Sequence, residues 1–267
     1  MLGAIIGDII GSRFEFNNAE SIDFDLFTDK CSFTDDTICT IAIADALNRG
    51  WDFKDMILTW CKKYPNPMGA YGGGFARWLY STDHKPYNSL GNGSAMRVSP
   101  VAWFYDDLET IVQEAEQTAI LTHNHPEGIK GAVSVARSIF YGRKYGASAM
   151  LRSASQDYHF QYPFIGRNPF DETCQGTLPV CYGIIRNTNS FEEAIRLAIG
   201  VGGDSDTIGA IVGSLAEAIY GVPDNIAEKA LQYLPLEMIE VIHEFYSISY
   251  SLPSERILAK IESILEK

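Results

Sequence analysis

Residues 202–223 read GGDSDTIGAIVGSLAEAIYGVP and hold the clearest helical pattern in the chain. The apolar residues that recur at the spacing of one helix face are Ile208, Ile211, Val212, Leu215, Ala216 and Ile219. Gly221 and Pro223 then end the pattern. The stretch therefore predicts a helix over residues 206–220 with one apolar face, and Asp204 and Asp206 place acidic side chains at its N-terminus.

Helical patterns recur along the chain, whereas alternating strand patterns are scarce. The segments that favour a helix are residues 37–48, 109–121, 128–141, 190–199, 225–232, 235–247 and 254–265. Ser190 and Glu193 have the spacing of a capping box at the start of one of them. The sequence therefore predicts an all-α fold, a compact many-helix single domain over residues 1–267 with its site at helix N-termini.

Residues 148–176 do not fit this pattern, because aromatic residues alternate there with residues that break helices. The aromatic residues are Tyr158, Phe160, Tyr162, Phe164 and Phe170, and the breakers are Pro163, Gly166 and Pro169. We expect a long loop, since Pro and Gly are typical of loops. Two interpretations stay open: a lid over the site, or a connector whose rings fill a gap in the core.

A second acidic helix start, FTDDT, occupies residues 33–37. Taken alone, Thr34 is explained as an N-cap, and the helix dipole favours acids after it. Together with residues 204–207, however, this start would bring four carboxylates around one point. Such a charge is costly in a cleft, and a pair of divalent cations with oxygen ligands would compensate it. The two starts therefore predict a binuclear metal site.

The N-terminal segment offers a further carboxylate. Gly3, Gly7, Gly11 and Glu15 recur every four residues and so lie on one helix face. Glycines on this face permit another helix to pack closely, and Glu15 stands where that packing would end. Asp8 lies on a nearby part of the same helix, where we expect it to support the metal ligands.

Two glycine-rich loops, residues 71–75 and 88–97, have backbone amides that could surround an anion. Neither matches a P-loop or a dinucleotide fingerprint, and each alone is also explained as an ordinary turn. His123 and His125 do not have the spacing of a metal site on a helix. A hydrogen bond from either ring to a ribose or to a carbonyl is the better interpretation, and a surface turn ended by Pro126 is the alternative.

The chain carries 21 Lys and Arg against 34 Asp and Glu, a formal net charge of −13, which argues against non-specific nucleic-acid binding. Its five cysteines include no CxxC pair and suit a reducing compartment. The apolar run over residues 3–10 is short and contains Asp8, so it fits neither a signal peptide nor a membrane span. We expect a cytoplasmic monomer that does not enter membranes.

Five motifs in a fixed order carry a resemblance that covers nearly the whole chain. They are GDIIGSRFE (residues 7–15), FTDDT (33–37), GNGSAMR (91–97), Thr122-His123 and GDSDT (203–207). In this combination the chain resembles the ADP-ribosylglycohydrolase family. The resemblance implies an all-α fold with two bound Mg²⁺ or Mn²⁺ ions.

The resemblance also implies the residues of the site. The implied metal ligands are Thr34, Asp35, Asp36, Asp204, Asp206 and Thr207. Glu15 and Asp35 are the expected catalytic residues. The implied ADP-ribose contacts are Gly72, Gly73, Gly74, Ser89, Gly91, Asn92, Gly93 and His123. The chain departs from the family pattern at Leu90, where many members have an aromatic residue.

The implied activity is metal-dependent hydrolysis of the glycosidic bond between ADP-ribose and a modified target, with arginine favoured as the modified side chain. The expected partner is ADP-ribose or an ADP-ribosylated protein. A non-catalytic ADP-ribose binding module with the same fold is the alternative. A prenyl-transferring enzyme would need a DDxxD spacing, and Cys39 and Thr40 stand where its further aspartate would be.

Overall fold

The computed structural model describes residues 1–250 and 253–266, and its regular elements are helices. In chain order they are α1 (Leu2–Gly11), η1 (Ser12–Phe14), α2 (Asp35–Arg49), α3 (Phe53–Lys63), α4 (Gly73–Leu79), α5 (Gly93–Met96), α6 (Ser99–Phe104), α7 (Leu108–Ile120), α8 (Pro126–Tyr145), α9 (Ala147–Ala154), α10 (Cys174–Arg186), α11 (Phe191–Gly200), α12 (Ser205–Tyr220), α13 (Asp224–Ala230), η2 (Leu231–Tyr233), α14 (Leu236–Ile248) and α15 (Glu255–Leu265). Within the described ranges the extended pairings are two isolated bridges, so the all-α prediction is confirmed.

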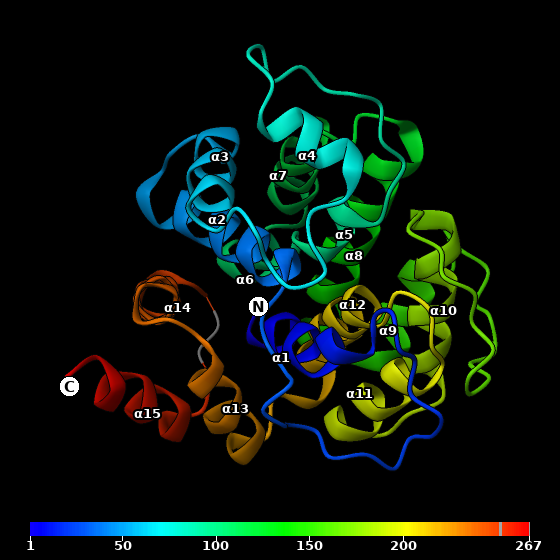
Figure 1. The fold of residues 1–267 in the computed structure, drawn as a ribbon. Coiled ribbons are helices and arrows are strands. Elements are labelled where there is room, and N and C mark those ends of the chain that lie inside the picture. The colour runs from blue at the N-terminus through cyan, green and yellow to red at the C-terminus, as the bar shows by residue number, and fades with distance from the viewer. Residues whose placement is uncertain (251–252, 267) are drawn as a thin grey trace.

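Helices α1 and α12 form the centre of the fold, and the other helices surround this pair (Figure 1). Every residue of α1 is buried, and so is α12 from Ser205 to Leu215. The apolar stripe of α12 predicted from the sequence is buried from Ile208 to Ala216. Each such large aliphatic side chain stabilises the fold by roughly 1.5–3 kcal/mol when fully buried.

Glycines let the backbones of α1 and α12 touch. A Cβ atom added at Gly7 would lie 1.9 Å from the carbonyl oxygen of Gly209, and one at Gly3 would lie 2.2 Å from that of Gly213. The relation is reciprocal, since a Cβ at Gly213 would lie 2.0 Å from the oxygen of Gly3. These distances are far below van der Waals contact. The close helix packing expected for the N-terminal glycine face is therefore present, and α12 is the partner helix.

Ser190 and Glu193 form a capping arrangement close to the predicted one. The Ser190 hydroxyl accepts a hydrogen bond from the Glu193 amide at 3.2 Å, as expected. The Glu193 carboxylate accepts from the amide of Asn189 at 2.8 Å, one residue before the cap. The side chain still satisfies a free backbone N–H at the helix start, which is the purpose of a capping box.

The expected loop over residues 148–176 was wrong at both ends. Helix α9 continues to Ala154, and α10 begins at Cys174 although Pro179 lies inside it. The irregular segment is thus residues 155–173. Gly183 of α10 explains part of the difference, because a Cβ there would lie 1.7 Å from the carbonyl oxygen of Gln161. Close packing of the segment against α10 outweighs the weak helix propensity of Gly and Pro.

Backbone hydrogen bonds fix residues 155–173 to the rest of the molecule. The amide of Gln161 donates to the Pro179 carbonyl at 2.9 Å, and that of Gly166 donates to Gly200 at 2.8 Å. Tyr158 is buried, with its ring 6.2 Å from that of Tyr182. These contacts support the connector interpretation for the first part of the segment, whereas Tyr162, Phe164 and Phe170 in its later part are exposed.

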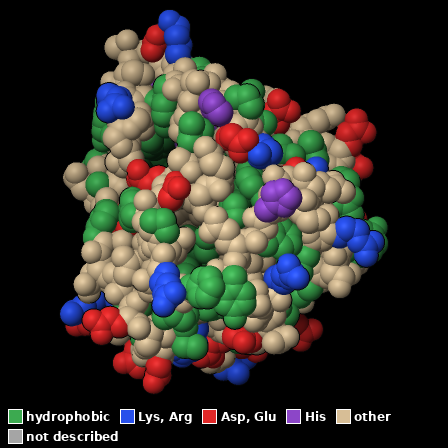
Figure 2. All heavy atoms as spheres, turned by 90° about the vertical axis from the view of Figure 1, so that its right-hand side faces the viewer, with side chains coloured by type: hydrophobic (Ala, Val, Ile, Leu, Met, Phe, Trp, Pro, Cys, Tyr) green, Lys and Arg blue, Asp and Glu red, His purple; other side chains and the backbone are tan. Residues whose placement is uncertain are grey.

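The surface of the described chain agrees with the charge balance of the sequence. On the face drawn in Figure 2, Lys and Arg side chains lie apart from one another among acidic and hydrophobic ones, so no basic stripe crosses it. None of the helices within residues 1–250 and 253–266 combines the length and apolar character required to cross a membrane.

Replacing Gly7 with alanine tests the central helix pair. The new methyl group would meet the backbone of Gly209, so we expect the free energy of unfolding to fall by about 3 kcal/mol, the upper end of typical overpacking effects. Gly73→Ala is the matched control, because its Cβ would have its nearest neighbour at 3.6 Å. Denaturant unfolding followed by tryptophan fluorescence measures both, and equal stability of the two variants would contradict the packing described above.

Candidate metal and ligand site

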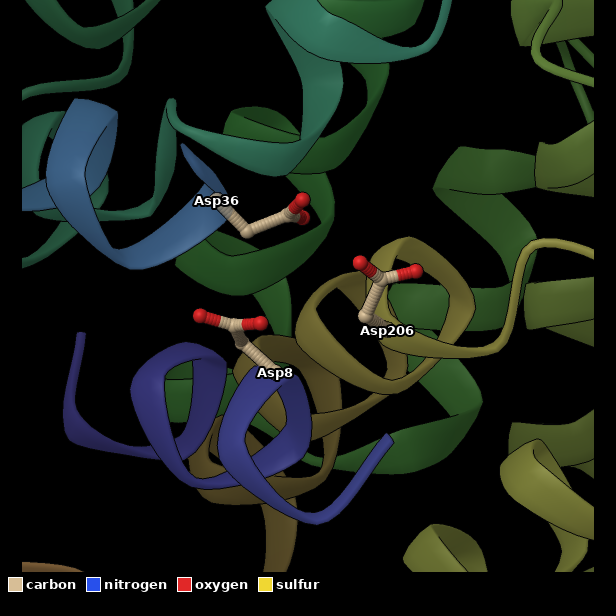
Figure 3. A group of neighbouring side chains, drawn as sticks. All are labelled: Asp8, Asp36 and Asp206. Carbon is tan, nitrogen blue, oxygen red and sulfur yellow. The ribbon is translucent and has the colours of Figure 1, made fainter. Parts of the chain in front are cut away.

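Carboxylates from separate helices converge beside the α1–α12 contact. Asp8 of α1, Asp36 of α2 and Asp206 of α12 point toward a common space (Figure 3), and one oxygen of each lies within 4.8 Å of the others. Glu15, Asp204 and Asp206 form a second such group. Asp206 belongs to both groups and so lies between them. We call these five residues the acidic cluster.

Asp8 fixes the start of α2. Its carboxylate accepts hydrogen bonds from the amide and hydroxyl of Thr34, at 3.0 and 2.7 Å, and from the amide and hydroxyl of Thr37, at 3.1 and 2.5 Å. Amides at a helix N-terminus lack partners inside the helix, so an acceptor from another helix satisfies them. Asp8 thereby holds the first turn of α2, which carries Asp35 and Asp36, against α1.

The two predicted threonine ligands occupy different positions. The Thr34 hydroxyl donates to Asp8 and accepts from the Asp36 amide at 3.2 Å, which is the geometry of an N-cap. The Thr207 hydroxyl faces the acidic cluster and donates to Asp36 at 3.2 Å. In this structure the Thr207 hydroxyl therefore lies beside Asp36, whereas the Thr34 hydroxyl is bound to Asp8.

Three buried oxygens of the acidic cluster have no hydrogen-bond partner. They are Oε2 of Glu15, Oδ1 of Asp36 and Oδ1 of Asp206. A buried polar atom without a partner costs about 1–3 kcal/mol, and more when it is charged. Divalent cations prefer such carboxylate oxygens as ligands, and each of the three oxygens belongs to a residue of one or both carboxylate groups. The residues present thus fit a metal site.

Burial dominates the electrostatics of the acidic cluster. It raises the pKa of Glu15 to about 7 and that of Asp8 to about 6, and the charge of Asp204 adds to the effect on Glu15. Burial followed by repulsion from Asp8 likewise raises the pKa of Asp36 well above its ordinary value. The pKa of Asp206 is also raised well above its ordinary value, first by burial and then by Asp36. A bound cation would favour the ionised forms and reverse these shifts.

The acidic cluster opens into a cavity of about 210 Å³. The residues that line it are Glu15, Asp35, Asp36, Cys39, Ala70, Gly72, Gly73, Gly74, Phe75, Tyr87, Ser89, Gly91, Asn92, Gly93, Met96, Arg97, His123, Glu172, Asp204, Asp206 and Thr207. Every site residue expected from the sequence is among them except Thr34. The structure therefore brings both glycine loops, His123 and the acidic helix starts to one cavity.

Sequence reasoning missed some of the lining residues. Tyr87 and Arg97 lie at the edges of a quoted glycine loop, so their position beside it was a usable signal. Cys39 comes one helical turn after Asp35 and faces the same side, as the helix period requires. Glu172 belongs to the segment 155–173, and no feature of the sequence indicated that it lines the cavity. Only the fold brings that segment to the cavity.

Asn92 links the glycine loop to the acidic cluster. Its side-chain amide donates to Asp204 at 2.7 Å and to the Thr177 hydroxyl at 3.0 Å. Its backbone amide donates to the carbonyl of Glu172 at 2.7 Å. One residue thus joins the loop to α12, α10 and the segment 155–173.

The backbone of Gly69 packs against the carboxylate of Glu15. A Cβ atom at Gly69 would lie 2.3 Å from Oε2 of Glu15, and the φ angle of +80° also favours glycine there. The carboxylate of Glu15 therefore packs directly on the backbone of residue 69.

Comparison with known proteins gives consistent matches. The sequence model of the family described as ADP-ribosylglycohydrolase matches residues 1–251. The chain is 28% identical to the ADP-ribosyl-[dinitrogen reductase] glycohydrolase of Rhodospirillum rubrum, over 84% of this chain and 85% of that protein. It is 24% identical to the ADP-ribosylarginine hydrolase Tri1 of Pseudomonas putida, over 83% and 70% of the two chains.

A solved structure has the same fold. It is titled ADP-ribosylglycohydrolase-related protein complex and aligns with a TM-score of 0.72 at 24% sequence identity. The alignment covers 92% of this chain and 96% of that one. The all-helical arrangement described above is therefore shared over almost the whole length of both chains.

The raised pKa values predict how pH affects the protein without cations. Because Glu15 and Asp8 bind protons more readily when folded than when unfolded, their stabilising contribution is present at low pH. It is lost as pH rises through their folded pKa values of about 6 and about 7. In EDTA we expect a lower melting temperature at pH about 7.5 than at about 5.5. Excess Mg²⁺ or Mn²⁺ should raise it mainly at the higher pH.

Differential scanning fluorimetry across this range measures the effect. Glu15→Gln is the control variant, since it cannot titrate at this position and should reduce the pH dependence in EDTA, leaving the part due to Asp8. A melting temperature that rises with pH in EDTA, or a cation effect that is larger at pH about 5.5, would contradict this account of the acidic cluster.

Proposed function

The chain belongs to the ADP-ribosylglycohydrolase family, and from this premise we propose that it hydrolyses the glycosidic bond that joins ADP-ribose to a modified target. The observation that carries the proposal is the set of buried, unpartnered carboxylate oxygens beside a cavity lined by glycine loops. Such oxygens suit divalent cations, and free loop amides suit the phosphates of a nucleotide. The activity would reverse ADP-ribosylation.

The proposed cation ligands are Thr34, Asp35, Asp36, Asp204, Asp206 and Thr207, with two Mg²⁺ or Mn²⁺ ions as the cofactor. The position of Asp206 in both carboxylate groups is what a ligand between two ions would have. When bound, the ions supply Lewis-acid polarisation and a template for the 2- and 3-hydroxyls of the distal ribose.

Glu15 is proposed to move the proton. Its carboxylate lies beside Asp204 and Asp206 at the cavity, and an ionised carboxylate there suits a general base. In the proposed step a water oxygen attacks C1 of the distal ribose, and Glu15 takes the proton that the water loses. The bond from C1 to the target atom breaks, and the target leaves with the proton that Glu15 returns to it. Asp35 would accept a hydrogen bond from a ribose hydroxyl on the cavity side of α2.

Gly72–Gly74, Ser89, Gly91, Asn92, Gly93 and His123 are proposed to hold the ADP-ribose. A Cβ atom at Gly93 would lie 3.0 Å from Nε2 of His123, so glycine there leaves room for the ring beside the loop. Arginine is the proposed modified side chain, supported by the relative named ADP-ribosylarginine hydrolase and by Glu15 and Glu172, the cavity carboxylates that are not among the proposed cation ligands. A positively charged guanidinium would be attracted to those groups.

An aspartate-to-asparagine change at residue 206 tests the metal assignment. Removing one charge from the ligand shared by both groups should lower cation affinity and metal-stimulated ADP-ribose release by more than about 100-fold, since even outer partners of ligands cost about 10–100-fold. Asp52→Asn is the matched control. Asp52 caps α3 on the surface, and asparagine caps a helix equally well.

The assay uses peptides ADP-ribosylated on arginine or serine, with Mg²⁺ or Mn²⁺ and calorimetry for cation binding. Full metal-stimulated turnover by Asp206→Asn would refute the assignment. Tight ADP-ribose binding without turnover of any substrate would favour the alternative, a binding module with intact acidic residues.

A further inference from the structure

Arg97 is a buried cation beside the cavity. Its side chain is 1% exposed, and among the described residues no carboxylate pairs with it. One terminal nitrogen, Nη2, donates to the carbonyl of Thr118 and to the hydroxyl of Thr122, both at 2.8 Å. Burying a charged residue is costly unless its hydrogen bonds are kept. The Thr118 carbonyl and the Thr122 hydroxyl oxygen are therefore committed to accepting from Arg97.

The Thr122 hydroxyl, which accepts from Arg97, also forms a hydrogen bond with the ring of His123. The hydroxyl oxygen lies 2.7 Å from Nδ1 of His123, and the side chain of Thr122 is fully buried. A hydroxyl group has one proton to donate and two lone pairs to accept with. Arginine has only donors, so Arg97 occupies one lone pair and cannot take the hydroxyl proton.

The hydrogen bond between Thr122 and His123 has one proton, which is carried either by the Thr122 hydroxyl or by Nδ1 of His123. If Nδ1 of His123 carried a hydrogen, it would donate to Thr122, and the Thr122 proton would need another acceptor. Within residues 1–250 and 253–266 the hydroxyl of Thr122 has hydrogen bonds to Arg97 and His123 and to no further group. A stranded buried donor costs about 1–3 kcal/mol. The hydroxyl therefore donates to Nδ1.

We infer that Arg97 and Thr122 together fix His123 in the tautomer that carries its hydrogen on Nε2, so that the ring presents a donor to the cavity. Nε2 is the nitrogen that faces the loop, since it is the atom nearest to a Cβ built at Gly93. It would donate to an oxygen of the bound nucleotide sugar, a phosphate or ribose oxygen. This last clause rests on the proposed function, whereas the tautomer does not.

The surroundings keep the ring neutral as well as oriented. Burial, followed by the positive charge of Arg97, lowers the pKa of His123 well below its ordinary value. The ring of Tyr87 lies on another side at 6.2 Å between centroids. A neutral ring with a defined donor nitrogen selects an acceptor from the ligand, whereas a ring that exchanged tautomers would offer a lone pair for part of the time.

Nitrogen-15 NMR of the ligand-free protein tests the inference directly. Protonated and unprotonated imidazole nitrogens have well-separated shifts, and a His123→Gln variant identifies the signals among the five histidines. We expect a protonated Nε2 and an unprotonated Nδ1 in the wild type. Thr122→Val should allow both tautomers and weaken ADP-ribose binding by roughly 10–100-fold, the effect of one hydrogen bond to a charged group. Thr122→Ser should restore both properties.

Thr118→Val is the matched control. Thr118 is a fully buried threonine near the end of α7, and its hydroxyl donates to the carbonyl of Ala115 at 2.8 Å rather than to His123. It should leave the tautomer unchanged. A wild-type ring protonated on Nδ1, or an unchanged tautomer in folded Thr122→Val, would overturn the inference.

The wild-type spectrum and Thr122→Ser still decide the question if Thr122→Val does not fold. Absence of ADP-ribose binding by the wild type would instead count against the proposed function, and the NMR readout of the tautomer would stand independently.

Discussion

The backbone contact between α1 and α12 is the constraint on which the rest of the structure depends. Because glycines face each other at residues 7 and 209, the two helices approach as closely as backbone atoms permit. The same row of contacts continues to Gly11, where a Cβ would lie 2.6 Å from the carbonyl oxygen of Ser205. Close packing therefore extends to the first turn of α12, and it brings Asp8 and Asp206 within reach of one another.

The sequence predicted those parts of the fold whose signals are local. Helix periodicity located α12. The spacing of the N-terminal glycines predicted that another helix packs closely on α1, but it did not identify that helix. The two acidic helix starts were recognisable because aspartates and a threonine directly precede or begin a helical pattern in each of them. The order of five motifs added the family, and with it the expectation that these elements surround one site.

The parts that could not be predicted depend on contacts between distant segments. Helix α10 contains Pro179, and its packing against residues 155–173 and against neighbouring helices such as α12 explains why it forms. Glu172 reaches the cavity for the same reason. The orientation of the Thr34 hydroxyl toward Asp8 also escaped prediction, since the sequence places Thr34 next to the acids but does not say which carboxylate it meets.

Asn92 joins the glycine loop to Asp204 through a direct hydrogen bond. In the proposed function, a nucleotide bound at the loop and a cation bound at Asp204 would act on the two partners of this hydrogen bond. Their two binding equilibria would then be linked, and linkage is reciprocal. By whatever factor the cation changes the affinity for the nucleotide, the nucleotide changes the affinity for the cation by the same factor.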